Sequence, residues 1–181
     1  MDLVLIRRSQ AGDEEAFGTL FHQYKNLVYR TAYLMLDDAG EAEDVLQEVF
    51  YQVHRSLSSF DPTKGAFTTW LHRITVNQCL NRRRRLRLPV LSLERLPCLP
   101  WAGHVPSPED RLAAEEIIGQ ELRHLSDKLR APVVLRYYRE LSYDEIAQIL
   151  DIPVGTVKSR LDAALKILRR RLRPVIKEER P

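Results

Sequence analysis

The chain has 181 residues, 44% of them hydrophobic, which limits it to one ordinary domain or to two small helical ones with modest cores. Its net charge of +3 conceals an alternation, because residues 1–60, 61–90, 91–150 and 151–181 carry −5, +6, −3 and +5. Phosphate binding needs clustered Lys and Arg, so this pattern predicts two nucleic-acid contacts, with acidic surfaces left for another partner.

Cysteine, histidine and N-terminal residues argue against several other classes of protein. The two cysteines, Cys79 and Cys98, are too few for a disulfide framework and form no Cys-x-x-Cys pair, which indicates a reducing compartment. The apolar run within residues 1–8 is far too short for a signal peptide or a membrane span. The five histidines stand singly and are expected at the surface or its boundary: His22, His54, His72, His104 and His124. We therefore expect a soluble, cytoplasmic protein with no metal site and no membrane insertion.

Two amphipathic helices are predicted within the first 60 residues. Asp13 can cap the first, which should end near residues 37–40. Its apolar stripe comprises Phe17, Leu20, Phe21, Tyr24, Val28, Thr31 and Met35. The stripe of the second helix comprises Ala42, Val45, Leu46, Val49, Val53 and Leu57. Acidic and polar residues are left largely on the other faces of the second helix: Glu43, Asp44, Gln47, Glu48 and Tyr51.

A loop and a third helix follow. Residues 60–66 place Pro and Gly at turn spacing, and the next helix is predicted from Phe67 to Arg85. Its apolar positions are Phe67, Trp70, Leu71, Ile74 and Leu80. It ends in the arginine run 82–85, which is expected to stay out of the core.

Residues 89–108 contain five of the ten prolines, a composition typical of a linker. Its apolar side chains could dock in a groove on a partner, or the segment could be an extended tether, and the sequence leaves both open. Helices are then predicted over 108–124 and 127–140. Pro132 lies inside the second and should bend it.

Residues 141–173 read as a short helix, a tight turn and a basic second helix. Ser142 can cap the first helix while Glu145 bonds back to the free backbone donors, and Pro153 suits the first turn of the next helix. Apolar residues of the second helix should face the core: Val157, Leu161, Ala164, Leu165 and Leu168. Polar residues should point outward: Thr156, Lys158, Ser159, Arg160 and Asp162. A solvated helical hairpin is the plain alternative. The combination of a capping box, a short turn and a basic second helix favours a DNA-binding helix-turn-helix.

With these motifs in view, the whole chain resembles a bacterial RNA polymerase sigma factor of the small, two-domain extracytoplasmic-function group in the sigma-70 family. Residues 43–50 resemble the family's core-binding helix, residues 67–74 its promoter-melting segment, and residues 142–160 its second-domain helix-turn-helix. Three motifs in the family's order form a specific signal, whereas each alone would be weak. One departure is Asp162-Ala163, where many relatives place a basic or aromatic contact residue.

The resemblance implies an all-α fold of two small helical domains joined by a flexible linker. Sigma region 2 would span residues 1–88, the linker 89–107 and sigma region 4 residues 108–181. The implied function is that of a dissociable subunit that directs core RNA polymerase to specific promoters and helps to melt them. Its partners would be core polymerase, promoter DNA with a duplex −35 and a melted −10 element, and an anti-sigma factor.

The resemblance also implies roles for individual residues. The clamp helices of the polymerase largest subunit would contact Asp44, Gln47, Glu48 and Tyr51. The −10 element and its melted strand would contact Lys64, Trp70, Arg73, Asn77, Arg82 and Arg83. The −35 element would contact Thr156, Lys158, Ser159 and Arg160. No catalytic residue, metal or cofactor is expected.

Two other functions fit parts of the sequence. A stand-alone helix-turn-helix regulator with an N-terminal sensing or dimerising domain would show the same second-domain motif, but it leaves the first-domain motifs unexplained. A metal-dependent phosphodiesterase could use acids near the start of the second helix: Asp37, Asp38, Glu41, Glu43 and Asp44. Acids that open a helix are explained more simply by its dipole.

Overall fold

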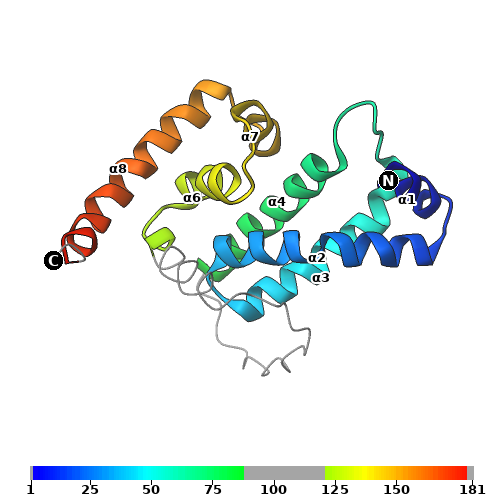
Figure 1. Cartoon of the computed structure of the whole chain (residues 1–181). Helices are drawn as coiled ribbons and strands as arrows, with labels where there is room; N and C mark the ends of the chain where they lie inside the picture. Colours follow the sequence, from blue (N-terminus) through cyan, green and yellow to red (C-terminus); the bar gives the residue numbers. More distant parts are fainter. Residues whose placement is uncertain (1, 88–120, 179–181) are drawn as a thin grey trace. The chain divides into compact units, whose positions relative to one another are not determined.

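The computed structural model describes residues 2–87 and 121–178, and these residues form helices joined by turns (Figure 1). The chain divides into two compact units, Met1–Pro106 and Ser107–Pro181. The prediction of an all-α fold is confirmed, because the described residues contain no strand. The predicted linker, and most of the helix predicted over 108–124, lie outside the described residues.

Over residues 2–87, the first unit is built from four α-helices and one short 3₁₀ helix. They are α1 (Asp2–Gln10), α2 (Glu14–Leu36), α3 (Ala39–Ser56), η1 (Leu57–Ser59) and α4 (Phe67–Arg87). As predicted, Asp13 caps α2 by accepting a hydrogen bond of 3.0 Å from the Ala16 amide. Asp38 caps α3 in the same way, from the Glu41 amide at 2.9 Å. The two caps satisfy backbone donors that have no partner inside the helices.

The core of this unit lies where α2, α3 and α4 pack against one another (Figure 1). Val28 of α2, Val45 and Val49 of α3, and Leu71 of α4 are fully buried there. The apolar stripes predicted for α2 and α3 therefore supply the packing, which is the main source of helix stability in a small domain.

Two features of the first unit differ from the sequence prediction. No helix was predicted before Asp13, yet α1 packs on α2, buries Ile6, and joins the unit through Gln10, whose amide donates to the carbonyls of Leu57 and Phe60 at 2.9 and 2.8 Å. His72 was expected at the surface or its boundary, but its side chain is 2% exposed. The α4 helix buries more of its circumference than its apolar residues indicated, because it packs on both α2 and α3.

Within residues 127–178, the second unit forms three α-helices and one π-helical turn. They are α6 (Asp127–Val133), η2 (Val134–Tyr138), α7 (Tyr143–Leu150) and α8 (Val154–Glu178). The predicted helix over 127–140 is therefore interrupted, and the π turn begins two residues after Pro132. Proline has no amide hydrogen to donate to the preceding turn, and a change of helical winding is one way to absorb that loss.

The turn between α7 and α8 brings the two helices together around a small core. Ser142 and Glu145 form the predicted capping box, with the Ser142 amide donating to Glu145 Oε2 at 2.8 Å. Pro153 precedes α8 instead of lying in its first turn, and its carbonyl accepts from Thr156 at 2.9 Å. The core is formed by apolar residues from α6, η2, α7 and α8, including Val133, Leu135, Ile146, Val157 and Leu161.

No helix within the described ranges is long and apolar enough to cross a membrane. The same residues contain no group of three or more His, Cys, Asp or Glu side chains that could hold a metal ion. The acids near the start of α3 have other contacts: Asp38 caps the helix, while Glu41 and Asp44 bind an arginine of α4.

Candidate nucleic-acid interface

The acidic face of α3 lies on the side of the helix away from its buried stripe. Gln47 is exposed, and Tyr51 is 65% exposed with the guanidinium of Arg55 5.7 Å from its ring centre. The side chains of Asp44 and Glu48 are 39% and 38% exposed. These four residues are spaced at three and four along one helix, so they form a continuous polar ridge.

Arg82 of α4 reaches across to α3 and binds three carboxylates, two of them in this ridge and the third on Glu41 one turn before it. Its Nε donates to Glu41, its Nη2 to Asp44, and its Nη1 to Glu48 at 3.2 Å. Burial alone works against the charged guanidinium, but the hydrogen bond to Glu41 and the three negative charges outweigh it and raise the pKa of Arg82. Arg82 is thus charged at any ordinary pH and engaged within its own unit.

The arginine run at the end of α4 therefore separates into inward and outward residues. Arg82 and Arg83 are only partly exposed, and Arg83 donates to the Met35 carbonyl near the end of α2 at 2.8 Å. Arg84 and Arg85 are exposed. None of the four arginines is buried, as predicted, but the first pair also binds groups of α3 and α2 while the second pair faces solvent.

An outward face of α4 carries three of the other residues predicted to contact the −10 element. Trp70, Arg73 and Asn77 follow one another at intervals of three and four, and Arg73 and Asn77 are exposed. The same spacing continues to Asn81 and Arg84, which are also exposed. Helical periodicity from Asn77 would have identified Arg84, rather than Arg82, as the arginine of this face.

The loop before α4 is held by local contacts and by aromatic packing. Asp61 accepts from the amide and the hydroxyl of Thr63 at 2.9 and 2.7 Å, and its carboxylate lies 3.8 Å from the ammonium of Lys64, whose side chain stays exposed. The Trp70 ring lies 5.2 Å from that of Phe60 and 5.7 Å from that of Phe67. Trp70 is only partly buried, so one part supports the loop and another remains available for stacking.

In the second unit, α8 presents its first turns to solvent as the sequence predicted. Lys158 and Ser159 are exposed, while Thr156 and Arg160 are partly exposed. Asp162, one turn beyond Lys158, is exposed on the same side. This helix follows α7 after a tight turn at Asp151, whose φ of 53° is left-handed. A solvent-facing second helix after such a turn is the geometry with which helix-turn-helix proteins enter a major groove.

Tyr143 contributes to this surface and was missed at the sequence level. Its ring has the Lys158 ammonium 5.8 Å from its centre and the Arg136 guanidinium at 5.1 Å. The Arg136 guanidinium also donates to the Leu141 carbonyl at 2.9 Å. The contact joins three elements that are separate in the sequence, so no local pattern would have revealed it.

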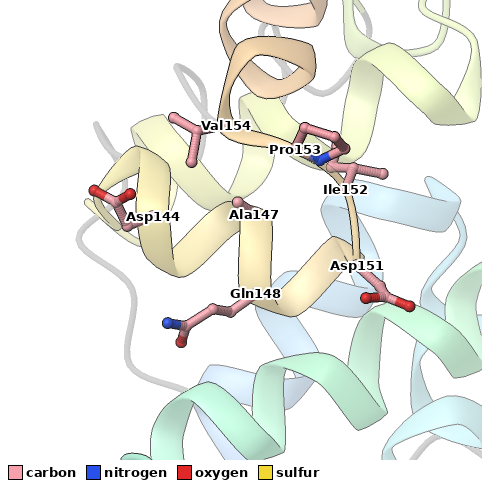
Figure 2. Close-up of a pocket in the computed structure, with 7 residues that line it drawn as sticks. All are labelled: Asp144, Ala147, Gln148, Asp151, Ile152, Pro153 and Val154. Carbon is pink, nitrogen blue, oxygen red and sulfur yellow. The ribbon is translucent and has the colours of Figure 1, made fainter.

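A shallow groove lies between α7 and the start of α8 (Figure 2). It is lined by Asp144, Ala147, Gln148, Asp151, Ile152, Pro153 and Val154. Figure 2 shows Asp144 and Asp151 at opposite ends of the α7 side of this groove. Their negative charges disfavour phosphate, so this side of the motif is poorly suited to the DNA backbone.

Further along α8 the basic residues are not equivalent. Arg169, Arg170 and Arg171 are all exposed, but Arg171 Nε donates to Glu121 at 2.7 Å. Neutralisation by Glu121 makes Arg171 a weaker candidate for phosphate than its two neighbours.

Comparison with known families and proteins agrees with this geometry. Residues 20–88 match the model of Sigma-70 region 2, and residues 115–168 match that of Sigma-70, region 4. The chain is 37% identical to the ECF RNA polymerase sigma factor SigW of Bacillus subtilis (strain 168), over 93% of this chain and 95% of that protein. It is 33% identical to the ECF RNA polymerase sigma-E factor of Escherichia coli (strain K12), over 97% of this chain and 96% of that one.

Solved structures show the same fold. The structure of CnrH in complex with the cytosolic domain of CnrY aligns with a TM-score of 0.72 at 24% identity, over 96% of this chain and 97% of that one. The sigma factor RpoE of Bartonella quintana, solved with the anti-sigma factor NepR, aligns with a TM-score of 0.64 at 20% identity, over 91% of this chain and 98% of that one.

Proposed function

Because the chain belongs to the extracytoplasmic-function group of the sigma-70 family and so directs core RNA polymerase to promoters for transcription initiation, we propose how its surfaces divide that work. The ridge formed by Asp44, Gln47, Glu48 and Tyr51 binds the clamp helices of core polymerase. The outward face of α4 and the loop before it bind and melt the −10 element, and the first turns of α8 read the −35 element.

One observation supports the polymerase assignment most directly. The apolar stripe of α3 is entirely used by the core of the first unit, and Asp44 and Glu48 stay partly exposed even though both bind Arg82, so a basic partner can still reach the acidic ridge. Complementary charge across an interface speeds association and fixes its register. The ridge also lies on a rigid helix, which suits a docking surface.

The two DNA assignments rest on exposed groups of different chemistry. The α4 face combines Trp70, which can stack on an unpaired base, with Arg73 and Asn77, which can bind phosphate and a base edge. Lys64 in the loop adds a second phosphate contact. On α8, Lys158 and Arg160 supply donors for bases or phosphates, and Thr156 and Ser159 supply hydroxyls. Arg82 and Arg83 were both predicted to contact the −10 element. Their bonds to carboxylates of α3 and to the Met35 carbonyl argue instead that they hold α4 against the rest of the first unit.

A charge-reversal experiment tests the polymerase assignment. Asp44→Lys with Glu48→Lys should greatly weaken capture by core polymerase while the helical circular-dichroism signal persists. The matched control is Glu14→Lys with Glu15→Lys, which changes the net charge equally at two exposed residues in the first turn of α2. If both double variants bind core polymerase like the unaltered chain, the ridge is not the docking surface.

Four further properties belong to the same proposal. Sigma factors are not a class of catalysts, and we propose that this chain performs no catalysis itself. It acts in the cytoplasm, where core polymerase is found, and an anti-sigma factor covers its surfaces before induction. The functional boundaries are those of region 2 over 1–88 and region 4 over 108–181, with a linker between them.

A further inference from the structure

We propose that Arg82 is a positioning residue for polymerase binding, which holds Asp44 and Glu48 in the arrangement that the clamp helices recognise. This inference rests on the proposed role of the acidic ridge. It assigns to the core-binding function an arginine that lies in a run otherwise suited to DNA phosphate.

The three carboxylates could not keep this arrangement unaided. Glu41, Asp44 and Glu48 follow one another at intervals of three and four on α3, so they are neighbours of like charge on one helical face, which is mutually repulsive. Arg82 donates to one oxygen of each. A planar guanidinium offers five N–H donors in a fixed fork, so it can fix three carboxylates at once where a lysine ammonium could not do so with the same geometry.

The cluster has an inner and an outer part. The Glu41 side chain is 14% exposed and that of Arg82 is 21% exposed, so this pair forms the inner part. Asp44 and Glu48, at 39% and 38%, form the outer part that a partner can reach. Arg82 binds one oxygen of each outer carboxylate, and within the described residues the other oxygen has no protein partner. A basic partner can therefore bind Asp44 and Glu48 without displacing Arg82.

Charge balance favours the same conclusion. Three carboxylates and one guanidinium leave the cluster with a net charge of −2, so the surface remains attractive to the basic side chains of a partner. Pre-ordering the carboxylates also reduces the side-chain entropy lost on binding. Arg82 thus acts in the free chain, before polymerase arrives, by preparing the surface.

The test measures binding to core polymerase in the absence of DNA, for the full chain at two salt concentrations. Arg82→Gln should weaken binding on the order of tenfold, and Arg82→Lys should recover part of that loss by restoring the charge without the fork. The matched control is Arg7→Gln, an exposed arginine on α1, which alters the net charge equally. Thermal unfolding of every variant is followed in parallel.

A double-mutant cycle separates positioning from a general effect on stability. In the background Asp44→Asn with Glu48→Gln, the change Arg82→Gln should cost much less core binding than it does in the unaltered chain, because the two outer carboxylates that it positions are gone and only Glu41 remains. Equal losses in both backgrounds would show that Arg82 acts on the fold and would overturn the proposal. So would unchanged core binding in Arg82→Gln accompanied by weaker binding to melted −10 DNA, which would make Arg82 a phosphate contact.

Failure of the underlying function gives a different result. If Asp44→Asn with Glu48→Gln does not weaken core binding, the ridge itself is not the docking surface, whatever Arg82 does. If that double variant weakens binding and Arg82→Gln does not, only the role given to Arg82 fails.

Discussion

The Lys158 ammonium lies 5.8 Å from the centre of the Tyr143 ring, so the first residue of α7 contacts the exposed side of α8. The Arg136 guanidinium approaches the same ring at 5.1 Å. Tyr143 therefore links the π turn, the first helix of the motif and its second helix. A cation held over an aromatic ring loses some of its rotational freedom, which would lower the entropy cost of the DNA contact proposed for Lys158.

Replacing the ring should weaken binding to the −35 element. Tyr143→Leu keeps an apolar side chain but removes the cation–π contact, which at an exposed site is worth about 0.5–1 kcal/mol, or about two- to fivefold in Kd. Tyr143→Phe keeps the ring and should bind nearly as well as the unaltered chain. Both variants can be compared as holoenzyme on −35 duplex DNA. Equal losses of −35 affinity in Tyr143→Phe and Tyr143→Leu would assign the effect to the hydroxyl group and not to the ring.

Arg160 and the exposed pair Arg169 and Arg170 should affect DNA binding differently. Arg160 is in the second turn of α8, where side chains reach base edges, so Arg160→Ala should cost about 1–3 kcal/mol and relax the preference at one or two positions. Neutralising Arg169 and Arg170 should weaken binding evenly across sequences and flatten its salt dependence. A randomised −35 library, probed with holoenzyme at two salt concentrations, distinguishes the two effects. An unchanged base preference in Arg160→Ala would mean that α8 lies differently in the groove.

Asn77 should matter for opening the promoter rather than for folding. Asn77→Ala removes an exposed amide from the outward face of α4, so initiation should fall more on duplex promoters than on templates already melted across the −10 region. The adjacent Gln78 provides a matched control, because its amide donates to Gln52 of α3 at 2.8 Å and faces away from that surface. Gln78→Ala should leave the ratio between the two templates unchanged. A similar defect on both templates in Asn77→Ala would exclude a role in melting.

The capping box of α7 should have a measurable share in the stability of the second unit. Ser142→Ala removes the hydroxyl that accepts from the Glu145 amide, a loss of about 1 kcal/mol. Ser126 precedes α6 but makes no side-chain cap bond, so Ser126→Ala should change the free energy of unfolding far less. Hydrogen exchange of the α7 amides in the full chain reports the effect locally. Equal exchange in the two variants would show that the box is dispensable.

Local chemistry along the sequence was sufficient to predict most helices and their caps. Asp13, Ser142 and Glu145 act within four residues of their partners, and the stripes of α2 and α3 repeat with the helical period, so no knowledge of distant residues was needed. The exposed positions of Asn77, Lys158 and Ser159 follow from the same periodicity. The family was also evident from the motifs, because their order and spacing survive in the sequence itself.

Contacts between distant residues were decided only by tertiary structure. The α1 helix exists as an element because α2 covers Ile6, and His72 is buried because α4 has neighbours on two sides. Four consecutive arginines look alike in sequence, yet Arg82 turns towards carboxylates 34 to 41 residues away while Arg84 faces solvent. A charged side chain's role depends on which charges the fold brings within a few ångströms, and that distance is not encoded in any local pattern.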